Sequence, residues 1–497
     1  MFARTLKGIR AALWPLALHF WYKYVLVAVG SVLVLLLLYG INEVIKKTTI
    51  NFPASVCLML LMFGGLSLSS WLFGEDKTNI VLRYIDIPFG FALRWMNIYF
   101  TPPFVTLVLS DKVSVAEAFT IAAVFVVGYL IGFGIIAYFT WGLQILLGTY
   151  KTDMAQDEET QSQESDQDSN QIDKIKEQIE DKEGLNNEDD PHRVPHGVQT
   201  EEIEWEDKVK SFLLQWVDFM VYGILFWVGV VVYYTTGYEM PVQLSTAVLL
   251  FRVCMLQPLR WRRFLHPILI SFSVSLLVFY ILSVIKGQNF FSCIRHYKTG
   301  RTYLHLFDAN QYTAWPGAGD FFISLMDISI VSLSLAMYNY RKDLKRYFVS
   351  IAPPIVLCSF MSFFIYPPVC YHLGISASRS LGFTGRSVTM ALGMPLVIAL
   401  DGSTQLMAVT TIISGILGVL CGDFMLFKMF RVRKHDFVTR GVTFGVNCGA
   451  VSTAYLIDID PRAGAMSSLA FTLFGTLMIV FSAIDPLVRV VQRLVGW

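Results

Sequence analysis

Residues 375–400 read ISASRSLGFTGRSVTMALGMPLVIAL, an apolar run that small and helix-breaking residues interrupt. The interruptions are Gly382, Gly385, Gly393 and Pro395, and a single arginine, Arg386, stands between them. Such breaks are tolerated at membrane depth only where the backbone is buried in protein or lines a cavity. We therefore predict a broken or re-entrant helix that reaches the middle of a bilayer, as transporters use to expose helix ends to an ion or anion.

The rest of the chain has the composition of a membrane protein. Of its 497 residues, 55% are apolar and 15% are charged, whereas about a quarter of the residues of a soluble protein are charged. Since a membrane span needs about 20 apolar residues, the sequence predicts an all-α polytopic membrane protein with about 12–13 hydrophobic segments, among them 87–109 and 437–457. His266-Pro267 and Gly385-Arg386 are each followed, about 60 residues on, by a strip of small and polar residues, so we also expect inverted repeats. We expect it in the plasma membrane or an organellar membrane, between which the sequence does not choose.

Acidic residues concentrate in one stretch of the chain. Residues 151–207 hold 20 of the 38 acidic residues and five basic ones, so the remainder has 34 basic residues against 18 acidic ones. Such a stretch is typical of a solvated, disordered linker. We therefore predict an N-terminal membrane domain at 1–148 with about four spans, a linker at 149–207, and a C-terminal transport domain at 208–497.

Basic clusters constrain the topology, because Lys and Arg accumulate in cytosolic loops. Three clusters follow the linker, at 260–263, 341–346 and 428–434, and three apolar runs separate the last two. If all clusters face the cytosol, one of these runs fails to cross, and 375–400 is the candidate. The alternative is an ordinary kinked helix with one cluster outside.

Three polar strips, at residues 386–389, 447–453 and 327–334, could bind a solute. An arginine inside an apolar run is costly unless it meets an anion, a carbonyl or water, and its planar fork suits a carboxylate. The first two strips supply the candidate binding residues Arg386, Ser387, Thr389, Asn447, Cys448, Ser452 and Thr453. Candidate coupling or cavity residues are Asp327, Ser329, Ser332 and Asp401. Snorkelling of Arg386, its pairing with Asp401, and plain helix packing are the competing readings.

Other chemistry finds no support in the pattern. The seven cysteines form no CxxC pair or Cys/His cluster, which argues against a metal site or a disulfide framework. Nucleotide-binding and hydrolase motifs are missing as well. We predict neither an enzyme nor a nucleic-acid-binding protein, and no cofactor beyond a coupling H+ or Na+.

Several motifs resemble the LrgB/CidB family. Gly385-Arg-Ser-Val-Thr389 is similar to its Pro-Lys-Ser-Val-Thr signature, and Gly464-Ala-Met-Ser-Ser-Leu-Ala470 to another conserved block. Phe52-Pro-Ala-Ser-Val56 and Tyr99-Phe-Thr-Pro-Pro103 resemble the smaller LrgA/CidA partner. The fusion of both halves is similar to the plastidal glycolate and glycerate carriers of plants and indicates a eukaryotic, for instance fungal, member.

The resemblance implies transport of small monocarboxylates such as glycolate, glycerate, pyruvate or lactate. It adds Ser467 and Ser468 to the binding candidates. It also implies an elevator-type carrier in which one domain moves against another, and we expect a homodimer in the lipid bilayer. The family's histidine is missing before Ala450, and Ala463 replaces its acid, so coupling or solute can differ.

The alternatives are a holin-like pore or oligomeric regulator of envelope integrity, and a scaffold whose acidic linker recruits a basic partner.

Overall fold

The computed structural model describes residues 13–48, 52–109, 113–148, 197–258, 267–305 and 315–497. Within these ranges the chain is all-α, and nine helices are long and apolar enough to cross a membrane. The protein is therefore an integral, multi-pass, all-α membrane protein. Most of the predicted linker, 149–196, and the basic cluster at 260–263 lie outside the described residues.

The N-terminal half contains three helices of spanning length. A continuous helix runs from Leu13 to Lys46 and includes η1 (Trp21–Leu26) and α2 (Val27–Lys46). It is followed by α3 (Ala54–Phe73), α4 (Glu75–Trp95), η2 (Met96–Phe100), α5 (Thr101–Val105), η3 (Thr106–Leu109) and α6 (Val115–Leu146). The expected span at 87–109 is instead divided among four short pieces, because charged residues occupy α4 and prolines follow at 102 and 103.

The C-terminal half begins earlier than expected. α8 (Gly197–Thr236) starts inside the predicted linker, so residues 197–207 are helical rather than disordered. Their glutamates are good helix formers and continue directly into an apolar span.

Short and long helices alternate in the rest of the chain. Those up to the region of Arg386 are α9 (Met240–Cys254), α11 (Pro267–Lys286), α12 (Phe290–Tyr297), η4 (Tyr303–His305), α13 (Ala318–Asn339), α14 (Arg341–Phe360), η5 (Met361–Ile365) and α15 (Tyr366–His372). The remainder are α16 (Ala377–Gly382), η6 (Phe383–Gly385), α17 (Met390–Ala399), α18 (Thr404–Leu417), η7 (Gly418–Gly422), η8 (Met425–Met429), α19 (Phe437–Ile459), α20 (Pro461–Ser482) and α21 (Asp485–Leu494).

The predicted break at Arg386 is a re-entrant helical hairpin, which we call hairpin 1 (residues 376–403). Its arms are α16 with η6 and α17, and residues 386–389 form the tip. The arms lie antiparallel, since the Ser403 amide donates to the Ser378 carbonyl over 2.8 Å and Gly385 packs against Val397. The run 375–400 therefore enters and leaves on the same side.

A second re-entrant hairpin occupies a run that we had expected to span the membrane. In hairpin 2 (residues 436–460), α19 reverses at Gly449, whose φ of 64° and ψ of −152° are not helical. Arg440 on one arm donates to Asp460 on the other over 2.8 Å. Gly445 and Thr453, on opposite arms, both meet Ser467 of α20. Only glycine adopts this conformation readily, which allows the reversal.

The long helix α6 shows that the hairpins enter from opposite ends. Near its start, Glu117 bonds the base of hairpin 1. Near its end, Gln144 donates to Asp436 at the base of hairpin 2 over 3.0 Å. These residues are separated by about 40 Å of helix. Gly132, between them, lies against both tips, so the tips meet near the middle of the molecule.

Each hairpin is followed by a helix that covers both hairpins. On α18, Thr411 bonds the Gly385 carbonyl of hairpin 1, and Gly415 packs on Val451 of hairpin 2. On α20, Ser467 packs on hairpin 2 and Gly475 on Leu392 of hairpin 1. The units 376–417 and 436–482 are therefore inverted relative to each other. This pair differs from the symmetry that the sequence suggested around His266, which lies outside the described residues.

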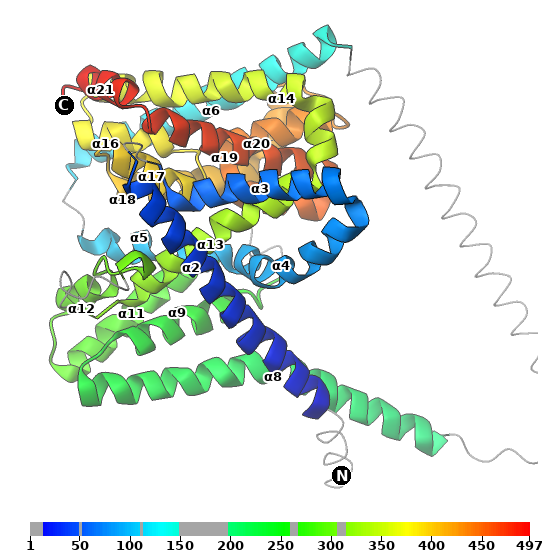
Figure 1. The fold of residues 1–497 in the computed structure, drawn as a ribbon. Coiled ribbons are helices and arrows are strands. Elements are labelled where there is room, and N and C mark those ends of the chain that lie inside the picture. The colour runs from blue at the N-terminus through cyan, green and yellow to red at the C-terminus, as the bar shows by residue number, and fades with distance from the viewer. Residues whose placement is uncertain (1–12, 49–51, 110–112, 149–196, 259–266, 306–314) are drawn as a thin grey trace, which may run out of the picture.

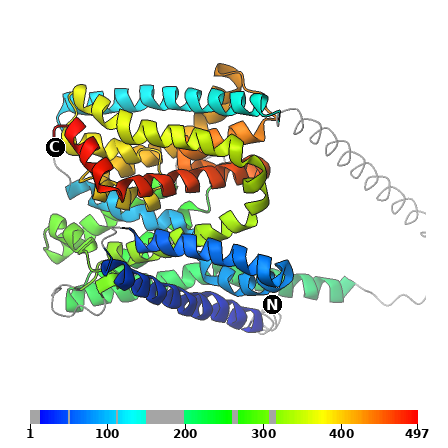
Figure 2. The same cartoon turned by 45° about the horizontal axis from the view of Figure 1, so that its top comes forward.

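The helices form two layers around the central α13. In Figure 1, α8, α9, α11 and α12 lie below it, and α6, α14, α19 and α20 lie above it. Figure 2 shows the same separation from a second direction. Tyr347, beside the cluster at 341–346, packs on Phe437, beside the cluster at 428–434. These two basic clusters thus lie at the same end of the molecule, as the topology argument requires.

Candidate functional site

Arg386 lies at the tip of hairpin 1 and is 1% exposed. Its Nη2 donates to the Tyr366 hydroxyl over 2.8 Å, and its guanidinium lies 4.4 Å from the centre of the Tyr366 ring. The Tyr366 hydroxyl in turn donates to the Gly128 carbonyl of α6. Ser414 of α18 donates to the Arg386 carbonyl over 3.2 Å. The arginine is therefore held in the interior and does not snorkel to an interface.

Several polar atoms around this arginine have no hydrogen-bond partner among the described residues. They are Nε and Nη1 of Arg386, the hydroxyls of Ser387 and Thr389, and Oδ1 of Asn447. Buried donors without acceptors are costly, and a buried unpaired charge is more costly still. No acidic residue of the described chain bonds Arg386, so a small anion is the missing complement that best fits these donors.

The tip of hairpin 2 faces the same place. The Asn447 amide donates to its own helix at Thr443, while its Oδ1 lies beside Gly132, together with Nη2 of Arg386. Gly449 lies against the Thr389 hydroxyl. Because α17 begins at Met390 and the second arm of hairpin 2 follows Gly449, two helix starts with incompletely bonded amides adjoin this place. This favours a negative ligand.

The other binding candidates lie within hairpin 2 and α20, and most of them are hydrogen-bonded there. Cys448 lies 3.1 Å from the Tyr129 hydroxyl of α6. Ser452 and Thr453 donate to the Gly449 carbonyl, and Thr453 lies 2.6 Å from Ser467. Ser468 is buried beside Ser467. These hydrogen bonds hold the backbone of hairpin 2 just beyond its tip.

The coupling candidates lie apart from the two tips. Asp327 accepts a hydrogen bond from Tyr303 over 3.0 Å, with Ser55 of α3 as a further partner. Ser329 and Ser332 donate to carbonyls of their own helix, α13. Asp401 is exposed beyond α17 and accepts from Gln492 rather than from Arg386. The pairing of Arg386 with Asp401 is therefore not present.

Sequence reasoning missed the residues that other helices bring to the tips. Tyr366 begins α15, and Tyr129 and Gly132 belong to α6 in the N-terminal half. One signal was available, because Gly128 and Gly132 form the G-x-x-x-G spacing that permits close helix contact. A Cβ at Gly132 would stand 2.9 Å from Arg386 Nη2.

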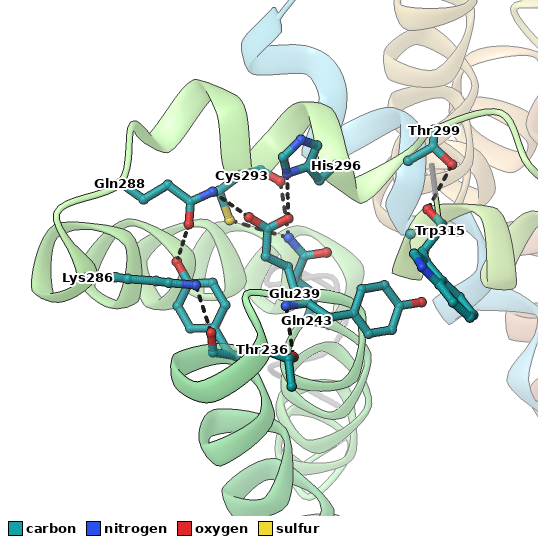
Figure 3. Close-up of polar contacts among 12 residues, drawn as sticks. Thr236, Glu239, Gln243, Lys286, Gln288, Cys293, His296, Thr299 and Trp315 are labelled. Carbon is teal, nitrogen blue, oxygen red and sulfur yellow. Dashed lines mark hydrogen bonds and ion pairs between the residues drawn. The ribbon is translucent and has the colours of Figure 1, made fainter. Parts of the chain in front are cut away.

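A separate polar cluster lies at the ends of α8 and α11, which Figure 3 shows in close-up. The buried carboxylate of Glu239 accepts hydrogen bonds from Gln288 over 2.7 Å and lies 2.8 Å from Nδ1 of His296. Burial raises the pKa of the nearby Cys293 thiol, which keeps it neutral. Since Glu239 has its partners within the protein, this cluster ties helix ends together.

The sequence of this chain is similar to those of known membrane proteins. Residues 247–485 match the model of the LrgB-like family. The plastidal glycolate/glycerate translocator 1 of Arabidopsis thaliana is 21% identical over 92% of this chain and 78% of its own length. The holin-like protein CidB of Staphylococcus epidermidis is 24% identical over 34% of this chain and 72% of its own length. No solved structure is significantly similar. Residues 247–485, which contain both hairpins, are therefore an LrgB-like domain.

Proposed function

We propose that this protein is a carrier of small monocarboxylates, with glycolate, glycerate, pyruvate and lactate as the first solutes to test. The observation that supports this most directly is the pair of unpartnered donor atoms on Arg386, where two opposed hairpin tips meet. A carboxylate could accept from Nη1 and from the second hydrogen of Nη2, the planar pair at the end of the guanidinium, and Nε would be left for a further solute oxygen. The hydroxyls of Ser387 and Thr389 suit the 2-oxo or 2-hydroxyl oxygen of such solutes.

The same geometry favours a carrier over a pore. A carrier needs a central site that is reached alternately from the two sides, and inverted repeats with broken helices provide one. We propose an elevator-type movement in which the two hairpins with α18 and α20 move against the remaining helices. The N-terminal half, 1–148, would then act as an LrgA-like scaffold, and a homodimer would hold the scaffold in the membrane.

A co-transported ion would offset the negative charge that the solute carries across the membrane. Since Arg386 is buried without an acidic partner among the described residues, an empty carrier has a buried positive charge and a loaded one does not. We propose H+ or Na+ as the coupling ion. Imposing a pH or a Na+ gradient on reconstituted vesicles tests this, because only the true co-ion gradient drives uptake above equilibrium.

Counterflow in liposomes tests the carrier itself. The purified protein should exchange labelled glycolate, glycerate, pyruvate or lactate saturably, and Arg386→Ala should reduce the exchange by about 100-fold, the loss expected for a buried bidentate ion pair of about 3 kcal/mol. Arg83→Gln on α4, which alters an exposed arginine, serves as the control. Non-saturable flux that is indifferent to Arg386→Ala would instead establish a holin-like pore.

A further inference from the structure

A cavity opens at the base of hairpin 1, beside the start of α18. It has a volume of about 600 Å³ and combines polar and apolar walls. Residues from the N-terminal half, from hairpin 1 and from the start of α18 line it, including Val113, Ser376, Arg379, Ser403 and Gln405. The cavity is several times larger than a three-carbon acid needs.

Two residues that line this cavity, Ser376 and Arg379, bind a carboxylate that belongs to the protein. Glu117 of α6 accepts from Nη1 of Arg379 over 2.6 Å and from the Ser376 amide over 3.1 Å. The two charged side chains are only 14% and 18% exposed. A guanidinium and a backbone amide thus already bind a carboxylate here, with the geometry that a free monocarboxylate would also use.

Arg379 and Arg386 lie on the same arm of hairpin 1, seven residues apart. That separation corresponds to about 10 Å along a helix. Hairpin 1 would therefore hold a solute carboxylate at two successive positions, one at its base and one at its tip.

We propose that Arg379 and the Ser376 amide form an outer carboxylate-binding position, and that Glu117 occupies it as an internal competitor of the solute. This inference rests on the proposed carrier function. An entering monocarboxylate displaces Glu117, and Glu117 returns when the solute moves to Arg386. Because an occupied position lowers the apparent affinity of any competitor, the ion pair sets the concentration at which transport from this side saturates.

Kinetics of two opposite variants test the competition. Glu117→Gln keeps the shape but removes the charge, so it should lower the half-saturating solute concentration by about 3- to 10-fold, as expected when a moderately exposed ion pair is released. Arg379→Gln should raise that concentration by at least about tenfold. Arg379→Lys, which keeps the charge, should have a half-saturating concentration between those of the wild type and Arg379→Gln. Glu43→Gln, in the exposed pair with Lys46, is the matched control and should change neither quantity.

A purely structural ion pair gives a different result. In that case Glu117→Gln and Arg379→Gln would both lower thermal stability and the maximal rate, and leave the half-saturating concentration unchanged. That outcome overturns the proposal.

Equilibrium binding separates this inference from the proposed function. Labelled pyruvate should bind weakly to purified Arg386→Ala protein, more tightly when Glu117→Gln is added, and not at all when Arg379→Gln is added. If the protein transports nothing but this order holds, the carrier function fails and the outer position stands. If Arg386→Ala abolishes transport but Glu117→Gln has no effect on binding, the carrier stands and the outer position fails.

Discussion

The two re-entrant hairpins share a backbone plan and differ in charge. Each has two short antiparallel arms, a tip near Gly132 of α6 and a long helix that follows it. Hairpin 1 places a buried arginine at its tip, whereas the tip of hairpin 2 contains the neutral Asn447 and Cys448. One tip therefore supplies the charge that a carboxylate needs, and the other supplies neutral contacts and close packing.

The bases of the hairpins show the reverse contrast. At the base of hairpin 2, Arg440 bonds Asp423 with two nitrogens and also bonds Asp460, which joins both arms to the preceding helical segment. The arginine at the base of hairpin 1 bonds outward, to Glu117 of the N-terminal half. The arginine of hairpin 2 thus joins its two arms, whereas the arginine of hairpin 1 joins that hairpin to α6. At its base, hairpin 2 contacts α6 through a neutral amide, that of Gln144.

Among changes to the backbone and the bases of the hairpins, the largest effect is expected at the tip of hairpin 2. In Gly449→Ala, the new Cβ would occupy a backbone conformation that costs about 1–3 kcal/mol and would press on Thr389. Counterflow should fall by about 30-fold or more, which corresponds to about 2 kcal/mol and lies in the upper part of that range. The control is Gly142→Ala on α6, where a Cβ meets open space. Counterflow at the wild-type rate in Gly449→Ala would mean that the tip geometry is unimportant.

A smaller loss is expected at the base of hairpin 2. Arg440→Gln removes four charge-assisted bonds to carboxylates that are partly exposed, so we expect about 1–2 kcal/mol of lost stability. Thermal unfolding in detergent should shift down by several degrees, and counterflow should fall by about tenfold. If Arg440→Gln instead matched Glu117→Gln, with stability retained and a lower half-saturating concentration, the contrast between the bases would be lost.

Gly132→Ala tests whether α6 adjusts the space between the tips. The new Cβ would approach Arg386 Nη2 to 2.9 Å and Asn447 Oδ1 to 3.1 Å, but both are ends of side chains that can yield. We expect the half-saturating concentration to rise by about threefold, which corresponds to less than 1 kcal/mol. A larger loss with pyruvate than with smaller anions such as formate would indicate that Gly132 limits solute size.

The smallest effect is expected from the acidic stretch. A carrier should tolerate deletion of residues 155–200 with less than about a twofold change in counterflow, because charged linkers act mainly as tethers. Uptake in intact cells gives the complementary readout. Loss of cellular function with normal counterflow in liposomes would support the scaffold alternative, in which this segment recruits a basic partner.

The sequence was informative where a residue type conflicts with its surroundings. An arginine among glycines in an apolar run predicted both the break in 375–400 and the position of the candidate site, because neither feature is stable at membrane depth without a local reason. Hairpin 2 gave no such conflict. Its two half-length arms together contain 23 residues, which is also the length of one span, so 437–457 read as an ordinary crossing.

The partners of Arg386 could not be predicted in the same way. Tyr366 precedes it by 20 residues and Gly132 by more than 250, and neither is unusual in its own segment. Asp327 is the converse case, since a buried acid is conspicuous in the sequence and the structure places it beside Tyr303, away from the tips. Its role in coupling stays a prediction.

The sequence by itself therefore determined the class of the protein, its helices and the place where its backbone must break, since these follow from local hydropathy and from the conformations of glycine and proline. Only the tertiary structure decided that two hairpins enter from opposite ends and that α6 of the N-terminal half contacts the bases and the tips of both. Those relations depend on packing between segments far apart in the chain, which no local pattern encodes.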